Sequence, residues 1–176
     1  MRRRRIIAVL PAAIASLVML AGIAWLGGLR INLTRSYPLG LWRIEPLDGP
    51  PAVGDLVFIC PPDGAAFRMA RERGYLGRGL CPGWFSPLIK TVVATEGQAT
   101  EIGAGVSVDG RPIPHADVQR EDAAGRALAP FDGGLVPRGF LFLHSNFAGS
   151  YDSRYFGPIP ASGLLGRARP LLTFAP

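Results

Sequence analysis

The distribution of apolar residues divides the chain into two parts of different character. Residues 6–29 (IIAVLPAAIASLVMLAGIAWLGGL) contain no charged side chain, and a helix of about 20 apolar residues can cross the ~30 Å hydrocarbon core of a bilayer. A cleavable secretory signal has a shorter apolar region, of about 7–15 residues. The pattern therefore predicts an uncleaved transmembrane helix within residues 1–29 and a separate domain over residues 30–176.

Beyond residue 30 the apolar residues form short runs separated by Gly and Pro, which favours strands joined by turns. We expect strands at residues 53–60, 87–94, 105–108 and 139–144, with Asp109-Gly110 as a hairpin turn after the third. Residues 62–83 are expected to hold one or two helical turns, and residues 117–134 a loop or a short helix. The pattern predicts a mainly β domain of antiparallel sheets.

The positive charge of the chain is concentrated at its start. The formal net charge is +6, and Arg2–Arg5 directly precede the apolar run. Arginines in this position place the N-terminus in the cytoplasm and the following domain across the membrane. We therefore interpret the charge as a topology signal, with the lipid bilayer and no nucleic acid as partner, and predict a single-pass protein of a bacterial inner membrane with a periplasmic domain.

The cysteine and histidine content limits the metal and redox chemistry. Cys60 and Cys81 lie on the expected periplasmic side, where disulfides persist, so they either form a disulfide or remain two buried thiols. His115 and His144 are the two histidines. They form no closely spaced pattern with the cysteines, so no structural zinc and no cofactor is expected.

Lysine use is the sharpest anomaly in the composition. The chain has 19 basic residues, and Lys90, inside the apolar run PLIKTVVA, is its only lysine. Arginine stays protonated, whereas a buried lysine can lose its proton near neutral pH and act as a general base. The alternative is a lysine on the solvent face of an edge strand.

Two further stretches offer partners for a neutral lysine. Ser36 lies in a stiff turn before Tyr37-Pro38, where its hydroxyl can be presented rather than buried. Serine with lysine is a known pairing of nucleophile and base. Residues 143–160 (LHSNFAGSYDSRYFGPIP) form a polar loop after a strand. Each stretch, taken by itself, also fits an ordinary turn.

In this order, these stretches resemble the conserved boxes of the S26 signal peptidases, and most closely those of the TraF-type conjugative-transfer peptidases. SYPLGLW (residues 36–42) is similar to the nucleophile box, KTVVATEG (90–97) to the lysine box, and HSN (144–146) with SYDSRYFG (150–157) to the last box. Three positions depart from the usual pattern: Tyr37 replaces methionine, Thr91 replaces arginine, and His144-Ser145 replaces Gly-Asp.

The resemblance implies a role for each matching residue. Ser36 would attack the scissile carbonyl and Lys90 would take its proton. Thr34 would form an oxyanion hole with the Ser36 N–H, and Ser150 would orient the lysine. The expected catalytic residues are Ser36, Lys90 and Asp152, and the expected supporting residues are Thr34, Ser150, Arg154 and Asn146.

The function expected from the resemblance is a membrane-anchored serine endopeptidase that processes a membrane-bound precursor such as a conjugative pilin. Hydrolysis and cyclisation of the product remain open. A general leader peptidase acting on signal-peptide-bearing proteins is the alternative within the same class. A non-enzymatic β scaffold of a secretion or conjugation apparatus is the alternative outside it. A Ser-His-Asp hydrolase is disfavoured because no Gly-x-Ser-x-Gly sequence is present.

Overall fold

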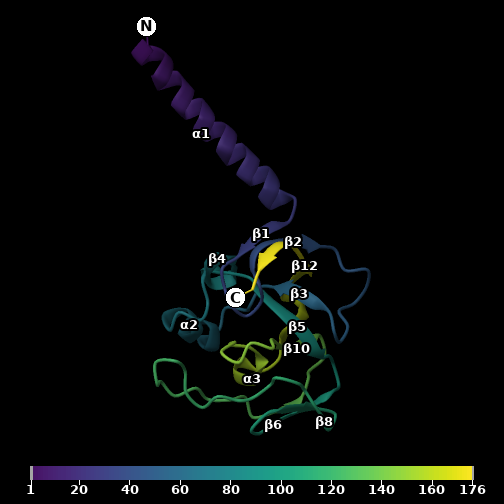
Figure 1. The fold of residues 1–176 in the computed structure, drawn as a ribbon. Helices are drawn as coiled ribbons and strands as arrows, with labels where there is room; N and C mark the ends of the chain where they lie inside the picture. The colour runs from purple at the N-terminus through teal and green to yellow at the C-terminus, as the bar shows by residue number, and fades with distance from the viewer. Residues whose placement is uncertain (1, 176) are drawn as a thin grey trace.

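A computed structural model describes residues 2–175, with side chains from residue 11 onward except that of residue 12. The side chains of Arg2–Arg5, which carry the predicted topology signal, lie outside this described part. Helix α1 (Arg2–Leu26) extends away from the β domain (Figure 1). Among the described residues, no helix combines the length and the apolar character that a membrane span requires.

The domain is built on two antiparallel sheets within the described residues. The larger has the order β1-β2-β12-β3-β5-β10-β11 and the smaller β8-β7-β6-β9. The smaller sheet lies at the end of the domain remote from α1 (Figure 1). The larger sheet comprises β1 (Leu29–Asn32), β2 (Leu39–Glu45), β3 (Leu56–Ile59), β5 (Leu88–Ala94), β10 (Phe140–His144), β11 (Ile159–Pro160) and β12 (Leu164–Phe174). The smaller comprises β6 (Ala99–Ile102), β7 (Val106–Val108), β8 (Arg111–Pro112) and β9 (Gly134–Leu135).

The predicted mainly β, antiparallel architecture is confirmed. Strands β3, β5, β7 and β10 each lie within one of the four expected ranges. Asp109 and Gly110 join β7 to β8 with φ of 50° and 74°, the left-handed pair that a two-residue hairpin turn uses. The Asp109 carboxylate accepts hydrogen bonds from the Ala99 N–H and the Gln98 amide, which connects this turn to β6.

The segment between the cysteines contains both helix and strand. Helix α2 (Ala65–Glu72) is followed by β4 (Arg78–Cys81) and a short 3₁₀ turn, η1 (Pro82–Trp84). Residues 117–133 contain no helix or named strand, in agreement with the expected loop. Further along the chain, α3 (Ser153–Phe156) and the 3₁₀ turn η2 (Ala161–Gly163) flank β11.

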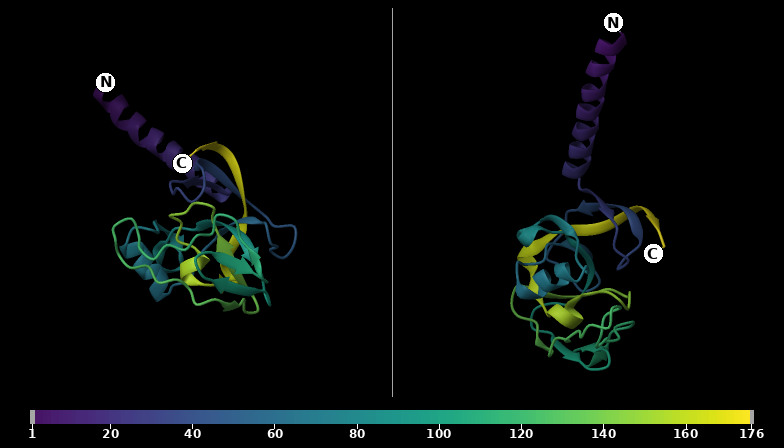
Figure 2. Two further views of the ribbon diagram at one scale, coloured as in Figure 1. Left: turned by 60° about the horizontal axis from the view of Figure 1, so that its bottom comes forward. Right: turned by 90° about the vertical axis from the view of Figure 1, so that its left-hand side faces the viewer.

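Strand β12 pairs with strands from the start of the domain and from its centre. It pairs with β2 along most of its length and with β3 near its beginning. Figure 2 shows β12, in yellow, running from the body of the domain to the side from which α1 leaves. The turn between β1 and β2 is therefore held beside the central strands.

The central strand β5 places alternate side chains in two different environments, because neighbouring side chains point to opposite faces. Ile89 packs with Trp42 and Phe58 in one apolar cluster, whereas Val92 belongs to a second cluster on the other face. Lys90 is two residues before Val92, so its side chain points to the same face as that of Val92, and it is only 2% exposed. The lone lysine is therefore a buried residue of a central strand, and the edge-strand alternative is wrong.

Candidate active site

The amine of Lys90 lies between two serine hydroxyls from distant parts of the chain. It donates to Ser36 Oγ at 3.2 Å and to Ser150 Oγ at 2.5 Å. The two hydroxyl oxygens are 3.3 Å apart. Ser36 comes from the β1–β2 turn, Lys90 from β5 and Ser150 from the loop before α3. The fold thus gathers three polar groups at one point.

Burial changes the acid–base behaviour of Lys90. Removal from water lowers the pKa of its amine from 10.5 to about 8, while the carboxylate of Asp152 opposes this change and Arg154 adds to it. At pH 7 about a tenth of such a group is neutral. An amine with this pKa, within hydrogen-bonding distance of a hydroxyl, can accept that hydroxyl's proton.

Asn32, at the end of β1, shapes the turn that carries Ser36. Its side-chain amide donates to the carbonyl oxygens of Thr34, Tyr37 and Pro38, at 2.9–3.0 Å. Its Oδ1 accepts from the N–H and the hydroxyl of Thr34. One buried side chain therefore closes the whole turn, and Asn32 was not among the residues expected from the sequence. An Asn four residues before a turn serine is the signal that could have found it.

Asp152 and Arg154 form a buried ion pair behind the serines, and both side chains are 0% exposed. Arg154 Nε and Nη2 each donate to a different carboxylate oxygen at 2.8 Å. The remaining guanidinium hydrogens reach the carbonyl oxygens of Asp117, Phe147 and Ser150. The pair therefore fixes the loop that carries Ser150. No hydrogen bond joins Asp152 to Lys90, so Asp152 acts on the amine through its charge and through this loop.

Ser145 is a site residue that was not among the expected ones. It is 0% exposed, its hydroxyl donates to the carbonyl oxygen of Ser36 at 2.6 Å, and its N–H donates to Asp152 Oδ2 at 3.2 Å. It therefore connects the buried ion pair to the turn that carries Ser36. In the family that the sequence resembles, an aspartate occupies the position of Ser145. This departure was visible in the sequence and could have marked Ser145 as a site residue.

The side chains of Thr34, Asn146 and His144 make no hydrogen bond to the Ser36 hydroxyl or the Lys90 amine. The Thr34 hydroxyl donates to Asn32 Oδ1 at 2.7 Å, and the Asn146 side chain is exposed. His144 is buried, and its Nε2 has no hydrogen-bond partner among the described residues. Within the described part, the side chains hydrogen-bonded to the Ser36 hydroxyl are Lys90 and Ser150, and neither is a histidine. This geometry gives no support to a Ser-His-Asp site.

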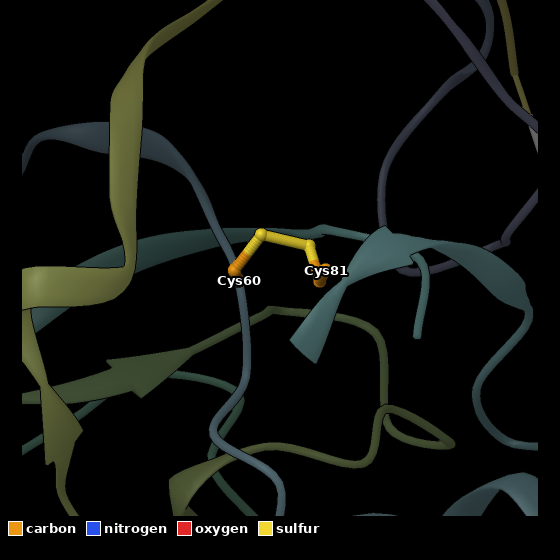
Figure 3. Close-up of a disulfide and its surroundings, with 2 residues drawn as sticks. All are labelled: Cys60 and Cys81. Atoms are coloured by element: carbon orange, nitrogen blue, oxygen red, sulfur yellow. A yellow bond between two sulfur atoms is a disulfide. The ribbon is translucent and has the colours of Figure 1, made fainter. Parts of the chain in front are cut away.

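One cavity adjoins the serine and lysine, and a second cavity shares part of its lining with the first. A cavity of about 310 Å³ is lined by Ser36, Lys90 and Tyr151. A second, of about 540 Å³ and mainly apolar, is lined by β1, by residues 77–81 and by residues of β3 and β5. Cys60 and Cys81 lie in the wall of the second cavity and form a disulfide with a Cα–Cα distance of 5.4 Å (Figure 3).

Comparison with known proteins identifies the family. The family model of signal peptidase, peptidase S26, matches residues 2–172. The chain belongs to the peptidase S26 family. A probable conjugal transfer protein TraF of Sinorhizobium fredii is 61% identical over 87% of this chain and 81% of its own length. The conjugal transfer protein TraF of Agrobacterium tumefaciens is 56% identical over both full lengths.

More distant relatives carry similar names. A plasmid transfer protein TraF of Escherichia coli is 36% identical over 89% of this chain and 90% of its own length. The expected resemblance to the S26 family, and within it to TraF-type proteins, is thereby confirmed. Membership of a signal peptidase family implies a peptidase that acts on a peptide or precursor protein.

Proposed function

We propose that this protein is a membrane-anchored serine endopeptidase that uses Ser36 as nucleophile and Lys90 as general base. The observation that carries the proposal is the position of the Lys90 amine, which is buried and 3.2 Å from the Ser36 hydroxyl. The lowered pKa of this amine supports it further, because a base must be unprotonated to act. Ser150 holds the amine from its other side.

The reaction follows from these positions. Lys90 Nζ takes the proton of the Ser36 hydroxyl while Oγ bonds to the scissile carbonyl carbon. Collapse of the tetrahedral intermediate breaks the C–N bond, and the Lys90 ammonium returns the proton to the departing amine. The remaining ester on Ser36 is then attacked by a second nucleophile, whose proton Lys90 accepts. Collapse of this second intermediate breaks the ester C–O bond, and the Lys90 ammonium returns the proton to Ser36 Oγ. Water as this nucleophile gives a linear product, and an amine of the same substrate gives a cyclic one.

The developing negative charge on the carbonyl oxygen requires hydrogen-bond donors. We assign this role to the Ser36 N–H and the Thr34 hydroxyl. The hydroxyl donates to Asn32 Oδ1 in the structure described, so it must rotate toward the oxyanion when substrate is bound. Loss of one such donor costs about 3–4 kcal/mol of transition-state stabilisation in other serine proteases. We assign Asp152, Arg154 and Asn146 to the support of this site.

The location and the substrate are also part of the proposal. Residues 6–29 are uncharged in sequence and long enough for a membrane anchor, and Arg2–Arg5 favour a cytoplasmic N-terminus with the domain in the periplasm. Only six residues separate residue 29 from Ser36, so the nucleophile would lie close to the bilayer. A conjugative pilin precursor is the proposed substrate, supported by the conjugal transfer names of the relatives.

Two substitutions test the proposal. Lys90→Arg keeps the positive charge but removes the ability to become neutral near pH 8, and Ser36→Ala removes the nucleophile. Each variant is reconstituted in liposomes with a conjugative pilin precursor, and the products are weighed by mass spectrometry, with folding checked by circular dichroism. We expect folded but inactive variants beside an active wild type, whose product mass separates the linear from the cyclic form.

The same assay distinguishes the alternatives. Normal processing by folded Lys90→Arg would overturn the Ser/Lys mechanism. Cleavage of many unrelated signal-peptide-bearing precursors at rates similar to the pilin precursor would identify a general leader peptidase. Wild-type protein that cleaves none of these precursors would support the non-enzymatic scaffold.

A further inference from the structure

We propose that the Cys60–Cys81 disulfide is a positioning element for substrate. It holds residues 77–86, here called the β4 wall, as one side of a groove that receives an extended apolar segment of the precursor. This inference rests on the proposed function, because it assigns a substrate-binding role beside the same serine. It concerns the binding of the peptide rather than the chemistry of Ser36 and Lys90.

The groove is continuous with the serine and lysine. The apolar cavity of about 540 Å³ and the smaller cavity beside Ser36 share lining residues, which include Leu33, Thr34, Ser86 and Ile89. A peptide chain whose scissile bond lies at Ser36 can therefore continue into the apolar cavity. Its lining is mainly apolar, with Arg30 and Arg78 as its charged members. It is suited to uncharged side chains, because a charge placed against the apolar part would lose its hydration. The occupant is thus an apolar stretch of the precursor next to the cleaved bond.

The disulfide is the covalent cross-link between the β4 wall and the central strands, and the C-terminal end of the wall is held separately, by the packing of Phe85 in the core and by its continuation into β5. Strand β4 belongs to neither sheet, and its bridges run to Phe85, within the wall itself. Leu80 and Trp84 are 72% and 70% exposed, so the outer side of the wall has little packing. The buried ring of Phe85 and a hydrogen bond from Arg71 to the Gly83 carbonyl attach its C-terminal end. Cys81 is joined covalently to Cys60, which directly follows the central strand β3.

The inner face of the wall is closely packed against itself. A Cβ added at Gly79 would lie 2.6 Å from the carbonyl oxygen of Phe85 and from Cα of Ser86. The Ser86 N–H also donates to the Gly77 carbonyl at 2.9 Å. The wall is therefore a narrow loop whose shape depends on Gly79, and Cys81 attaches its β4 side to the end of β3. A change at either residue should alter the groove.

The reacting groups do not depend on this attachment. Ser36, Lys90 and Ser150 are held by the β1–β2 turn, by β5 and by the ion-paired loop. Reduction of the disulfide should therefore weaken peptide binding and leave the reactivity of the serine unchanged. Because disulfides persist in oxidising compartments, such a protein would bind its precursor well only after the domain had reached one.

Reduction of the full-length protein in detergent micelles is the first test. Oxidised wild type, dithiothreitol-reduced wild type and the double variant Cys60→Ser/Cys81→Ser are compared on quenched fluorescent peptides that span the precursor's cleavage site. Ser36-dependent hydrolysis of p-nitrophenyl acetate, which is too small to reach the groove, measures the chemistry alone. We expect KM for the peptides to rise at least tenfold on loss of the disulfide, with acetate hydrolysis unchanged within twofold. An unchanged KM, or an equal loss of both activities, would overturn the inference.

A second variant covers the case in which the cysteine variant fails to fold. Gly79→Ala keeps the disulfide but forces β4 away from Phe85 and Ser86 and so changes the shape of the wall, and we again expect a higher KM with normal acetate hydrolysis. Gly103→Ala is the matched control, because a Cβ there meets no atom within 4 Å. Equal KM values for Gly79→Ala and Gly103→Ala would contradict the proposal. If wild type and Ser36→Ala hydrolyse acetate and peptide equally, the proposed function itself is wrong.

Discussion

The hydroxyl of Ser145 donates a hydrogen bond to the carbonyl oxygen of Ser36 over 2.6 Å, across 109 residues of sequence. Because the Ser145 N–H also donates to Asp152, a continuous path of hydrogen bonds runs from the buried ion pair to the peptide unit of Ser36, the proposed nucleophile. The loop that positions the base partner Ser150 and the turn that carries Ser36 are therefore fixed relative to each other. Through this link Asp152 influences the position of Ser36 without contacting Lys90.

The first prediction concerns this link. Ser145→Ala removes the bond to Ser36, so the Ser36 turn can shift, and a displacement of about 1 Å at a reacting group can cost on the order of 100-fold in rate. We expect kcat to fall about 10- to 100-fold with little change in KM, measured by steady-state kinetics. The pH profile should keep its midpoint, because the surroundings of Lys90 are unchanged. Ser145→Thr retains the hydroxyl and should restore part of the rate, and equal rates for the Ala and Thr variants would refute the positioning role.

The second prediction is the pH dependence of catalysis. Burial lowers the pKa of Lys90 to about 8, and the base acts in its neutral form. We expect kcat/KM to rise about tenfold per pH unit below pH 8 and to level off above it. Initial rates between pH 6 and pH 9.5 measure the profile. A rate that is flat over this range would exclude Lys90 as the titrating base.

The third prediction is the pH dependence of stability. The pKa of Lys90 is lower in the folded state, at about 8, than its ordinary value of 10.5. Between these values the unfolded chain binds more protons, so the free energy of unfolding rises as pH increases from 8 to 10.5. Below pH 8 the full cost of the buried amine is present, on the order of 3 kcal/mol. Lys90→Met should remove this dependence, as measured by urea unfolding at pH 7 and pH 10. A pH dependence equal to wild type in Lys90→Met would assign the effect to another group.

The fourth prediction concerns the buried ion pair. Asp152→Asn leaves the guanidinium of Arg154 buried without its charge partner, which typically destabilises a protein by about 3–5 kcal/mol. The exposed pair Arg68–Asp63 supplies a matched control, because removal of a surface pair usually costs less than about 1 kcal/mol. Thermal unfolding of Asp152→Asn and Arg68→Gln compares the two. Similar unfolding temperatures for both variants would contradict a structural role of the Asp152–Arg154 pair.

Several features of the fold were accessible from local sequence. The apolar runs around strands β3, β5, β7 and β10 predicted these strands, and Asp109-Gly110 predicted the hairpin turn, because side-chain alternation and turn chemistry act over a few residues. Strands β1, β2 and β12 were not predicted. Gly166 and Pro170 interrupt the apolar pattern of β12, and its pairing with β2 joins residues more than 120 positions apart.

The sequence by itself determined that the one lysine lies in an apolar strand and that a serine in a turn precedes it. Both features depend on residue type and on interactions between residues close together in the chain. Only the tertiary structure decided that Lys90 is buried, that its amine meets both Ser36 and Ser150, and that Ser145 joins Ser36 to the ion pair. These contacts bridge 54 to 114 residues. They depend on how the strands pack around a common core, and this packing cannot be predicted from the pattern of neighbouring residues.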